Sequence, residues 1–594
     1  MTIILKKKYS LIEKSTTTSE LLLSLLLIYL TVTIIKIFFV LQIPSPFIFS
    51  DETAYSKMAL SFFESKTFSL WGVPAGYPPP LYPVILSISY IFGDITAAYP
   101  VMKVINAFLS SLIIIPVFLI ADEFISIKKS LIVAFLSSLL PASFSFTSTI
   151  MSENLFYPLF MFSLFFMMKS IIEDDKKWDI LCGLFIGLSI LTRMPGLALL
   201  IILLFALLVK GIYTILPEDG ITVRIKIGKI FQAFIDKWCI FLSSAVVAFP
   251  WLLRNGYYFG FTSYGLTGES IGMAGGIAKY GGSQPTNIPI IDFIYWAAMH
   301  IGYFIFATGI IFFALAMLQT WKIVTQKPIN KTTYVNIKLK AFILISWVSF
   351  TTLVLLCAYH KFHGGNYLMG RYLDPILPAF IIMGAVGLDS FTKRDFKPFF
   401  GTLIVCSVVL VFIPINSMIR AFNTPDAYIL LVPQRLYEMD VLSFEPNVIF
   451  IKLFLLILPF FFLILAKKNA LKWKCIAPLL LIFFVTGSML ASGVMYAAST
   501  DAQDEMKVGL WLHNHAPKNS AILFDERDAD RMNWAMWGTM FWTDNIIKIG
   551  NVSAVEADYV VSLHRLNLPL VLEVGTETEV IRSYNNHYFV YRSK

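Results

Sequence analysis

The sequence predicts an α-helical, polytopic membrane protein of about 13 spans that carries a small α/β domain at its carboxyl end. Of the 594 residues, 57% are hydrophobic and only 14% are charged. Many apolar runs are long enough to cross a hydrocarbon core of about 30 Å at about 1.5 Å per residue. After Ala497 the composition changes to a mixture of charged, turn and short apolar segments. These observations exclude a water-soluble fold for residues 1–497.

The first apolar run, Leu21–Leu41, is longer than the apolar core of a typical signal peptide and is followed by no small-residue cleavage site. We therefore interpret it as a retained anchor. The remaining spans follow from the same length criterion. They are expected at Ala98–Ile120, Leu131–Phe146, Met151–Met168, Trp178–Leu191, Pro195–Val209, Trp238–Leu253, Phe293–Leu318, Ala341–Ala358, Tyr372–Leu388, Phe399–Ile415, Val448–Ala466 and Cys475–Tyr496.

Basic residues predict the orientation, because lysine and arginine in short loops stay on the cytoplasmic side. The lysine-rich amino terminus is therefore expected in the cytoplasm. Counting spans from there places the other basic loops on the same side, namely those around residues 128–129, 176–177, 224–229, 322–340, 393–397 and 467–474. The net charge of +9 is then explained largely by topology beside an anionic inner leaflet, and it does not indicate a nucleic-acid partner.

The tail, residues 498–594, is expected to form a separate extracytoplasmic domain, and residues 1–497 form the membrane domain. Short apolar stretches at 520–524, 557–562 and 588–591 are typical of strands, and Gln503–His515 is the expected helix. The five cysteines all lie in or beside apolar spans. They predict neither a disulfide framework nor a zinc site.

Two adjacent acids, Asp51 and Glu52, follow the first span and precede the proline-rich segment Tyr77–Pro83. One interpretation is structural, since acidic residues complement the dipole in the first turn of a helix. The other is functional, because the surrounding loop is rich in aromatic and apolar residues and is expected to lie on the bilayer surface. Acids held at such a surface favour a chemical role.

Several motifs in the membrane part resemble one known family in the family's own order. They are Asp51-Glu52-x-x-Tyr55, Tyr77-Pro78-Pro79-x-x-Tyr82-Pro83, Met151-Ser152-Glu153-Asn154-Leu155-Phe156-Tyr157-Pro158, Leu191-Thr192-Arg193-Met194-Pro195-Gly196 and Gly370-Arg371-Tyr372-Leu373-x-Pro375-x-x-Pro378. The chain resembles the polyprenyl-phosphate-dependent GT-C glycosyltransferases, in the branch related to protein O-mannosyltransferases and lipid A aminoarabinose transferases. The resemblance implies transfer of one sugar from a polyprenyl-phosphate donor to a lipid, glycan or protein acceptor at the outer face, with inversion.

The resemblance assigns roles to the acidic motifs. Asp51 matches the family's base, and a carboxylate there would take the proton of the acceptor hydroxyl. Glu52 is expected to contact the acceptor or to fix the loop, and Tyr82 is expected among the substrate-binding residues. Glu153 matches a second acidic position near the site. The alternative for Glu153 is a helix-capping role together with Ser152.

The departing lipid phosphate requires positive charge, so outward basic residues are the next candidates. Arg371 could bind phosphate through two parallel donors, or it could be an interfacial anchor that snorkels to the surface. Arg193, Lys361 and His363 could line the same pocket, with an ordinary interfacial role as the alternative. His360 and His363 lack a clear third metal ligand, so no metal site is assigned. A divalent metal and any other cofactor stay open.

Three other classes of protein stay open as alternatives. An oligosaccharyltransferase shares the GT-C design, but its Trp-Trp-Asp-Tyr-Gly signature is absent, and the tail segment 534–538 lacks the aspartate. A lipid or solute transporter is expected to carry ionisable groups within its spans, where Lys36 and His300 are the main examples. A non-catalytic membrane scaffold would not need Asp51 and Arg371 on the same side.

Overall fold

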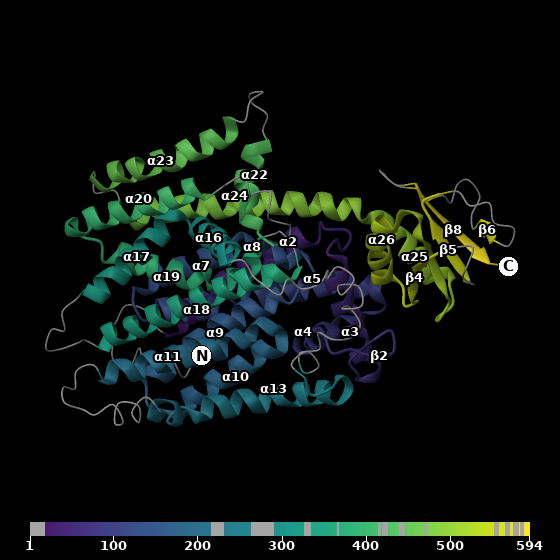
Figure 1. Ribbon diagram of the computed structural model, residues 1–594, viewed down its shortest axis with the longest axis horizontal. Helices are drawn as coiled ribbons and strands as arrows, with labels where there is room; N and C mark the ends of the chain where they lie inside the picture. Colours follow the sequence, from purple (N-terminus) through teal and green to yellow (C-terminus); the bar gives the residue numbers. More distant parts are fainter. Residues whose placement is uncertain are drawn as a thin grey trace.

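The structure is a computed structural model in which helices run along the long axis of the molecule and a small sheet lies at one end (Figure 1). The residues that it describes are 18–215, 231–262, 266, 290–325, 334–364, 368–413, 417–418, 426–438, 446–467, 472–551, 557–564, 571–573, 581–582 and 587–593. The elongated shape places the membrane helices and the sheet in two separate regions.

The membrane part is a helical bundle because long apolar segments can satisfy their backbone hydrogen bonds in lipid only within a helix. Its main helices are α2 (Thr18–Val40), α5 (Ile95–Ser111), α6 (Ile114–Ala121), α7 (Ile127–Ser138), α8 (Pro141–Ser145), α9 (Glu153–Ile172), α10 (Lys176–Thr192), α11 (Ala198–Ile215), α13 (Trp238–Phe259), α16 (Ile290–Ala307), α17 (Ile310–Thr325), α18 (Tyr334–Gly364), α19 (Leu377–Asp389), α20 (Phe396–Phe412), α23 (Pro446–Lys467) and α24 (Trp473–Asp501). Their buried apolar side chains form one continuous core.

The polytopic helical fold is confirmed. Among the described residues, 9 helices are long and apolar enough to span a membrane, or up to 10 if the bent pair Ile127–Ser138 and Pro141–Ser148 counts as one span. That pair bends by 61°, and proline begins its second part because a proline without an N–H group is tolerated in a first helical turn. The number of 13 spans stays a prediction.

Three of the expected spans are wrong in detail. The run Leu131–Phe146 is not one helix, because it bends at the break between α7 and α8. The run Phe293–Leu318 is not one helix, because it breaks between α16 and α17 at Gly309, whose φ of +75° is a conformation that glycine adopts readily. The run Tyr372–Leu388 becomes helical only at Leu377. The residues before it form the short 3-10 helices η4 (Gly370–Tyr372) and η5 (Asp374–Ile376), the second of which has a proline in its first turn.

The connection between α2 and α5 builds a surface layer at the end of the bundle that carries the sheet (Figure 1). It consists of α3 (Phe49–Ser65), the hairpin of β1 (Ser69–Leu70) and β2 (Val73–Pro74), α4 (Leu81–Leu86) and the 3-10 helix η1 (Ser87–Phe92). Helix α3 packs against α4 on one side and against the carboxyl-terminal region on the other. This layer holds Asp51 and Glu52 in the first turn of α3.

The carboxyl-terminal region is an α/β unit with its own hydrophobic core. Helix α25 spans Gln503–His515, the range expected from the sequence, and is followed later by α26 (Ala529–Trp542). The sheet order is β4-β3-β5-β8-β6, with β3 parallel to β4 and β5, and β8 antiparallel to its neighbours. The strands are β3 (Ile522–Asp525), β4 (Ile547–Gly550), β5 (Tyr559–Ser562), β6 (Val571–Glu573) and β8 (His587–Ser593), and β7 (Ile581–Arg582) pairs with β8.

Candidate active site

The two adjacent acids at the start of α3 have different surroundings. Glu52 is buried, and its carboxylate accepts backbone N–H groups from Phe47 (2.9 Å), Ile48 (2.8 Å) and Ile150 (2.8 Å). Burial raises the pKa of Glu52 to about 7, although these three amide donors oppose the rise. Glu52 therefore joins the start of α3 to the bent segment before α9. Of its two expected roles, the structure favours fixing the loop.

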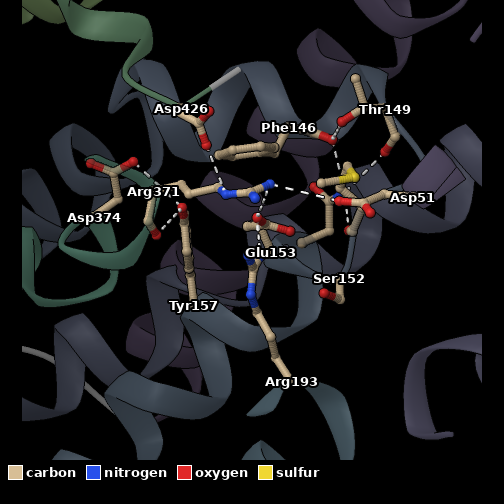
Figure 2. Close-up of polar contacts among 12 residues, drawn as sticks. Asp51, Phe146, Thr149, Ser152, Glu153, Tyr157, Arg193, Arg371, Asp374 and Asp426 are labelled. Atoms are coloured by element: carbon tan, nitrogen blue, oxygen red, sulfur yellow. Dashed lines mark hydrogen bonds and ion pairs between the residues drawn. The ribbon is translucent and has the colours of Figure 1, made fainter. Parts of the chain in front are cut away.

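Asp51 points away from these amides and toward a basic side chain. Its Oδ2 lies 3.7 Å from Nη1 of Arg371, and 25% of its side-chain surface is exposed (Figure 2). Burial raises the pKa of Asp51, and the Arg371 guanidinium lowers it in part. Asp51 makes no hydrogen bond that caps α3, whose start is held by Glu52 instead. A partly exposed carboxylate with a raised pKa can accept a proton from a substrate.

Arg371 lies on η4 between three carboxylates (Figure 2). Besides Asp51, its Nη1 lies 3.8 Å from Oε1 of Glu153, and its Nε lies 2.8 Å from Oδ1 of Asp426. The Arg371 backbone N–H also donates to the Asp426 carbonyl at 2.7 Å. Only 15% of the Arg371 side chain is exposed. Burial alone would lower its pKa, but the carboxylates outweigh burial and raise it. These contacts do not fit a snorkelling anchor.

Glu153 begins α9 and is fully buried. Its Oε1 forms an ion pair with Nη1 of Arg193, the residue directly after α10, in addition to its approach to Arg371. Ser152 makes no side-chain cap of α9, because its hydroxyl is hydrogen-bonded to the Tyr55 hydroxyl at 2.7 Å. The arrangement therefore favours a place in the charged network over the capping alternative for Glu153.

The two arginines share one aromatic neighbour. The guanidinium carbons of Arg193 and Arg371 lie 5.0 Å and 5.5 Å from the centre of the Tyr372 ring. A guanidinium within about 6 Å of a ring centre is attracted to the electron-rich face. Tyr372 thus helps to hold two like charges in one site while the carboxylates of Glu153 and Asp426 neutralise them.

The sequence did not predict a second group of polar residues in this site. Asp374 accepts hydrogen bonds from the hydroxyls of Tyr303 (2.5 Å) and Tyr157 (3.4 Å), and Tyr157 also donates to the Arg371 carbonyl at 3.0 Å. Asp426 is the other missed residue. Tyr157 is a named position of a quoted motif, so its signal was present. Asp374 stands at an unspecified position of another motif, and Asp426 lies in a long segment without a motif.

Of the other expected substrate-binding residues, the structure describes the side chain of Tyr82. Tyr82 is fully buried, and its hydroxyl donates to Oδ1 of Asn106 at 2.8 Å while its ring meets the Tyr55 ring edge-to-face. It is placed to support Tyr55 and not to contact a substrate. Lys361 and His363 belong to α18 by backbone, but their side chains lie outside the described part. Within that part, no group of three His, Cys, Asp or Glu residues could hold a metal ion.

Gly370 precedes Arg371 and lies close to Tyr303 and Asp426. A Cβ added there would overlap the Tyr303 ring and lie 2.8 Å from the Asp426 carbonyl oxygen, the acceptor of the Arg371 N–H. We expect Gly370→Ala to displace η4 and to lower the free energy of unfolding by about 1–3 kcal/mol. Thermal unfolding of the purified protein in detergent measures the change. Gly401, whose added Cβ meets nothing within 4 Å, provides the matched alanine control. An unchanged melting temperature for Gly370→Ala would contradict the expectation.

Comparisons with known proteins report on the family and the fold. The family model for dolichyl-phosphate-mannose-protein mannosyltransferases matches residues 78–222. No curated protein matches the chain. The solved structure of ArnT from Cupriavidus metallidurans in the apo state has a TM-score of 0.55 at 12% identity, over 95% of this chain and 97% of that chain. The same protein bound to undecaprenyl phosphate has a TM-score of 0.54 at 12% identity, with the same coverage. The family match covers part of the chain, and the shared fold over nearly the full length of both chains shows that this protein has the GT-C fold.

Proposed function

We propose that the protein is an integral membrane glycosyltransferase that moves a single sugar from a polyprenyl-phosphate donor to an acceptor at the outer membrane face. The observation that carries the proposal is the partly exposed carboxylate of Asp51 beside the guanidinium of Arg371, 3.7 Å apart. The matched family acts with dolichyl phosphate mannose, and the similar ArnT binds undecaprenyl phosphate. Both lipids are polyprenyl phosphates, which supports a donor of that class.

In the proposed reaction, Asp51 is the general base. The acceptor hydroxyl gives its proton to the Asp51 carboxylate while its oxygen forms a bond to the anomeric carbon. The bond between that carbon and the phosphate oxygen breaks, and its electron pair leaves with the phosphate. A single displacement of this kind inverts the anomeric carbon, and positive charge develops on the sugar in the transition state.

Arg371 is proposed to receive the departing phosphate. A guanidinium binds phosphate through parallel N–H donors and stabilises the negative charge that develops on the leaving oxygen. Among the described residues, its Nε and Nη1 face carboxylates. Arg193 supports this role indirectly. Its ion pair with Glu153 partly neutralises that carboxylate, so Glu153 competes less with the phosphate for Arg371.

The contacts of Lys36 and His300, two ionisable residues within the spans, argue against transport as the function. Nζ of Lys36 donates to Oγ of Ser110 (2.9 Å) and to the Ser143 carbonyl (3.1 Å). His300 pairs through Nδ1 with the Trp296 carbonyl (2.7 Å) and accepts the Met369 N–H at Nε2 (3.1 Å). These two ionisable residues within the spans thus form fixed packing contacts, which supports structural roles for them.

Transfer of one sugar also fits the sequence better than transfer of an oligosaccharide. The tail segment that resembles the oligosaccharyltransferase signature without its aspartate lies in α26, which packs against α3. The proposal places the amino terminus in the cytoplasm and residues 498–594 on the outer side. The acceptor is a hydroxyl of a lipid, a glycan or a protein, and the transferred sugar is a hexose or a pentose.

The direct test is transfer of radiolabelled sugar by the purified protein in lipid vesicles, from a panel of polyprenyl-phosphate sugars to a membrane extract. Label that moves to the extract in the presence of one donor supports the proposal. Chromatography and mass spectrometry of the product then identify the acceptor and the anomeric configuration. No transfer with any donor, in the presence and absence of added divalent cations, would refute the proposed activity.

The proposed base gives the reaction a defined pH dependence. Asp51 must be deprotonated to accept a proton, so kcat is expected to fall as the pH drops through its pKa. Burial raises that pKa above the ordinary aspartate value, so the fall should begin at a higher pH than for an exposed aspartate. A pH–rate profile of kcat measures the midpoint. A rate that stays constant down to the ordinary aspartate pKa would contradict the assignment.

A further inference from the structure

Helix α3 presents two different faces. Residues four apart lie on the same face of a helix, and neighbouring positions are rotated by about 100°. Asp51 and Tyr55 therefore share one face, which points to Arg371 and Ser152. Thr53 and Lys57 share a second face, about half a turn away. The carboxyl-terminal region covers that second face.

The contacts on the second face are specific. The Thr53 hydroxyl donates to the carbonyl of Trp537 in α26 at 3.0 Å. Nζ of Lys57 forms an ion pair with Oδ1 of Asp544, just after α26, at 2.9 Å. The Lys57 side chain is only 4% exposed, so its ammonium has little access to water and depends on this partner. Asp544 is the carboxylate that compensates the buried charge.

Further contacts fix the carboxyl-terminal region against the same end of the bundle, as its position beside α3 shows (Figure 1). The Tyr99 ring in α5 lies 5.4 Å from the rings of both Phe541 and Trp542 in α26. The Ser45 hydroxyl donates to the carbonyl of Ala502, the residue directly before α25, at 3.3 Å. The region is thus held by the membrane domain as well as by α3, so it can act as a rigid support.

We propose that Lys57 is a positioning residue for Asp51 and that Asp544 makes the carboxyl-terminal region part of the catalytic unit. This inference rests on the proposed function for its catalytic readout. Helix α3 is held on two sides, by the Glu52 carboxylate on the backbone of Ile150 and by the Lys57–Asp544 pair. Loss of the second support lets the first two turns of α3 shift relative to Arg371.

The first variants are Lys57→Met and Asp544→Asn. Methionine keeps most of the lysine volume, and Asp544 is 31% exposed, so its carboxylate keeps contact with water and Lys57→Met is expected to fold. A displacement of about 1 Å in a reacting group can cost about 100-fold in rate. We expect kcat to fall about tenfold to 100-fold in either variant, with the donor KM nearly unchanged. Lys66→Met, which changes the exposed lysine directly after the same helix, is the matched control.

The double variant Lys57→Met/Asp544→Asn tests whether the two residues act as a pair. Residues that act together are not additive, so the double variant is expected to be no slower than the slower single variant. Additive losses would overturn the pairing. An unchanged kcat in Lys57→Met would overturn the positioning role, whatever the double variant shows.

A second measurement does not depend on activity. Hydrogen exchange of the backbone amides of residues 49–57, followed by mass spectrometry in vesicles, reports how firmly α3 is held. We expect exchange about tenfold faster in Lys57→Met than in the unmodified protein or in Lys66→Met. If the unmodified protein transfers no sugar but exchange is faster in Lys57→Met, the proposed function fails, while the support of α3 by the Lys57–Asp544 pair is still shown. If transfer is seen and exchange is unchanged, the inference fails.

Discussion

Replacing Asp51 by asparagine is expected to reduce sugar transfer about 10²- to 10⁴-fold, the range that a positioned general base contributes. Asparagine keeps the shape of the side chain but cannot accept the proton of the acceptor hydroxyl. The protein should stay folded, because Asp51 makes no capping hydrogen bond and the start of α3 is held by Glu52. Initial rates of label transfer in vesicles, at saturating donor, measure the loss.

Two further variants test whether the effect of Asp51→Asn comes from the loss of the base at this position. Glu64→Gln removes an exposed carboxylate from the same helix and is expected to leave kcat unchanged. Asp51→Glu keeps the charge but moves it by one methylene, so it should retain more activity than Asp51→Asn. Full transfer by a folded Asp51→Asn protein would remove Asp51 from the reaction. Equal losses in Asp51→Asn and Glu64→Gln would indicate a general effect of charge on α3.

Replacing Arg371 by lysine is expected to reduce kcat about 10²- to 10³-fold, the cost of losing one well-placed donor to a developing negative charge. Lysine keeps the positive charge, but it lacks the planar fork that can contact Asp426 through Nε while other N–H groups face a phosphate. The backbone hydrogen bond to the Asp426 carbonyl remains, so η4 should keep its place. Rates with a series of donor sugars measure the effect.

The control for Arg371→Lys is another arginine-to-lysine substitution, at an exposed position outside the site. Arg394→Lys changes an exposed arginine on η6 (Lys393–Asp395) and is expected to leave transfer unaffected. If Arg371 stabilises the leaving phosphate, the loss should appear in kcat more than in the acceptor KM. A loss confined to the acceptor KM would instead place Arg371 in acceptor binding, and a full-rate Arg371→Lys enzyme would exclude a fork-shaped contact.

The sequence predicts the helical fold because its main signal, the length of apolar runs, is local. It cannot show where such a run breaks. Gly309 lies inside an apolar run and is tolerated in a helix, so only its contacts in three dimensions decide that α16 ends and α17 begins. Likewise, Pro375 and Pro378 could begin a helix at either place, and the structure selects the later one.

The sequence predicted only those residues of the candidate site that belong to local motifs. Asp51, Glu153, Arg193 and Arg371 belong to quoted motifs, and the structure brings them together. Their partner Asp426 comes from a segment without a motif, so nothing in one sequence marks it as the neighbour of Arg371.

For Glu52 and Tyr82, a place in a motif did not show which contacts the side chain makes. Both belong to motifs near the proposed base, yet Glu52 binds backbone amides and Tyr82 binds Asn106. Because each residue of α3 is rotated by about 100° from the one before, Glu52 and Asp51 point in different directions. These directions can be assigned only when the first residue of the helix is known. A motif thus identifies residues that belong to a site and its support together.

Helix α24 and helix α25 are separated by the single residue Ala502, so no flexible linker joins the membrane domain to the carboxyl-terminal region. Inserting one residue into α24 would turn everything beyond it by about 100° and advance it by about 1.5 Å. Seven residues would nearly restore the rotation but add about 10 Å of height. Neither change keeps Asp544 opposite Lys57. The length of α24 is therefore as strictly constrained as the identity of a side chain, and natural relatives that conserve the contact should vary in length elsewhere.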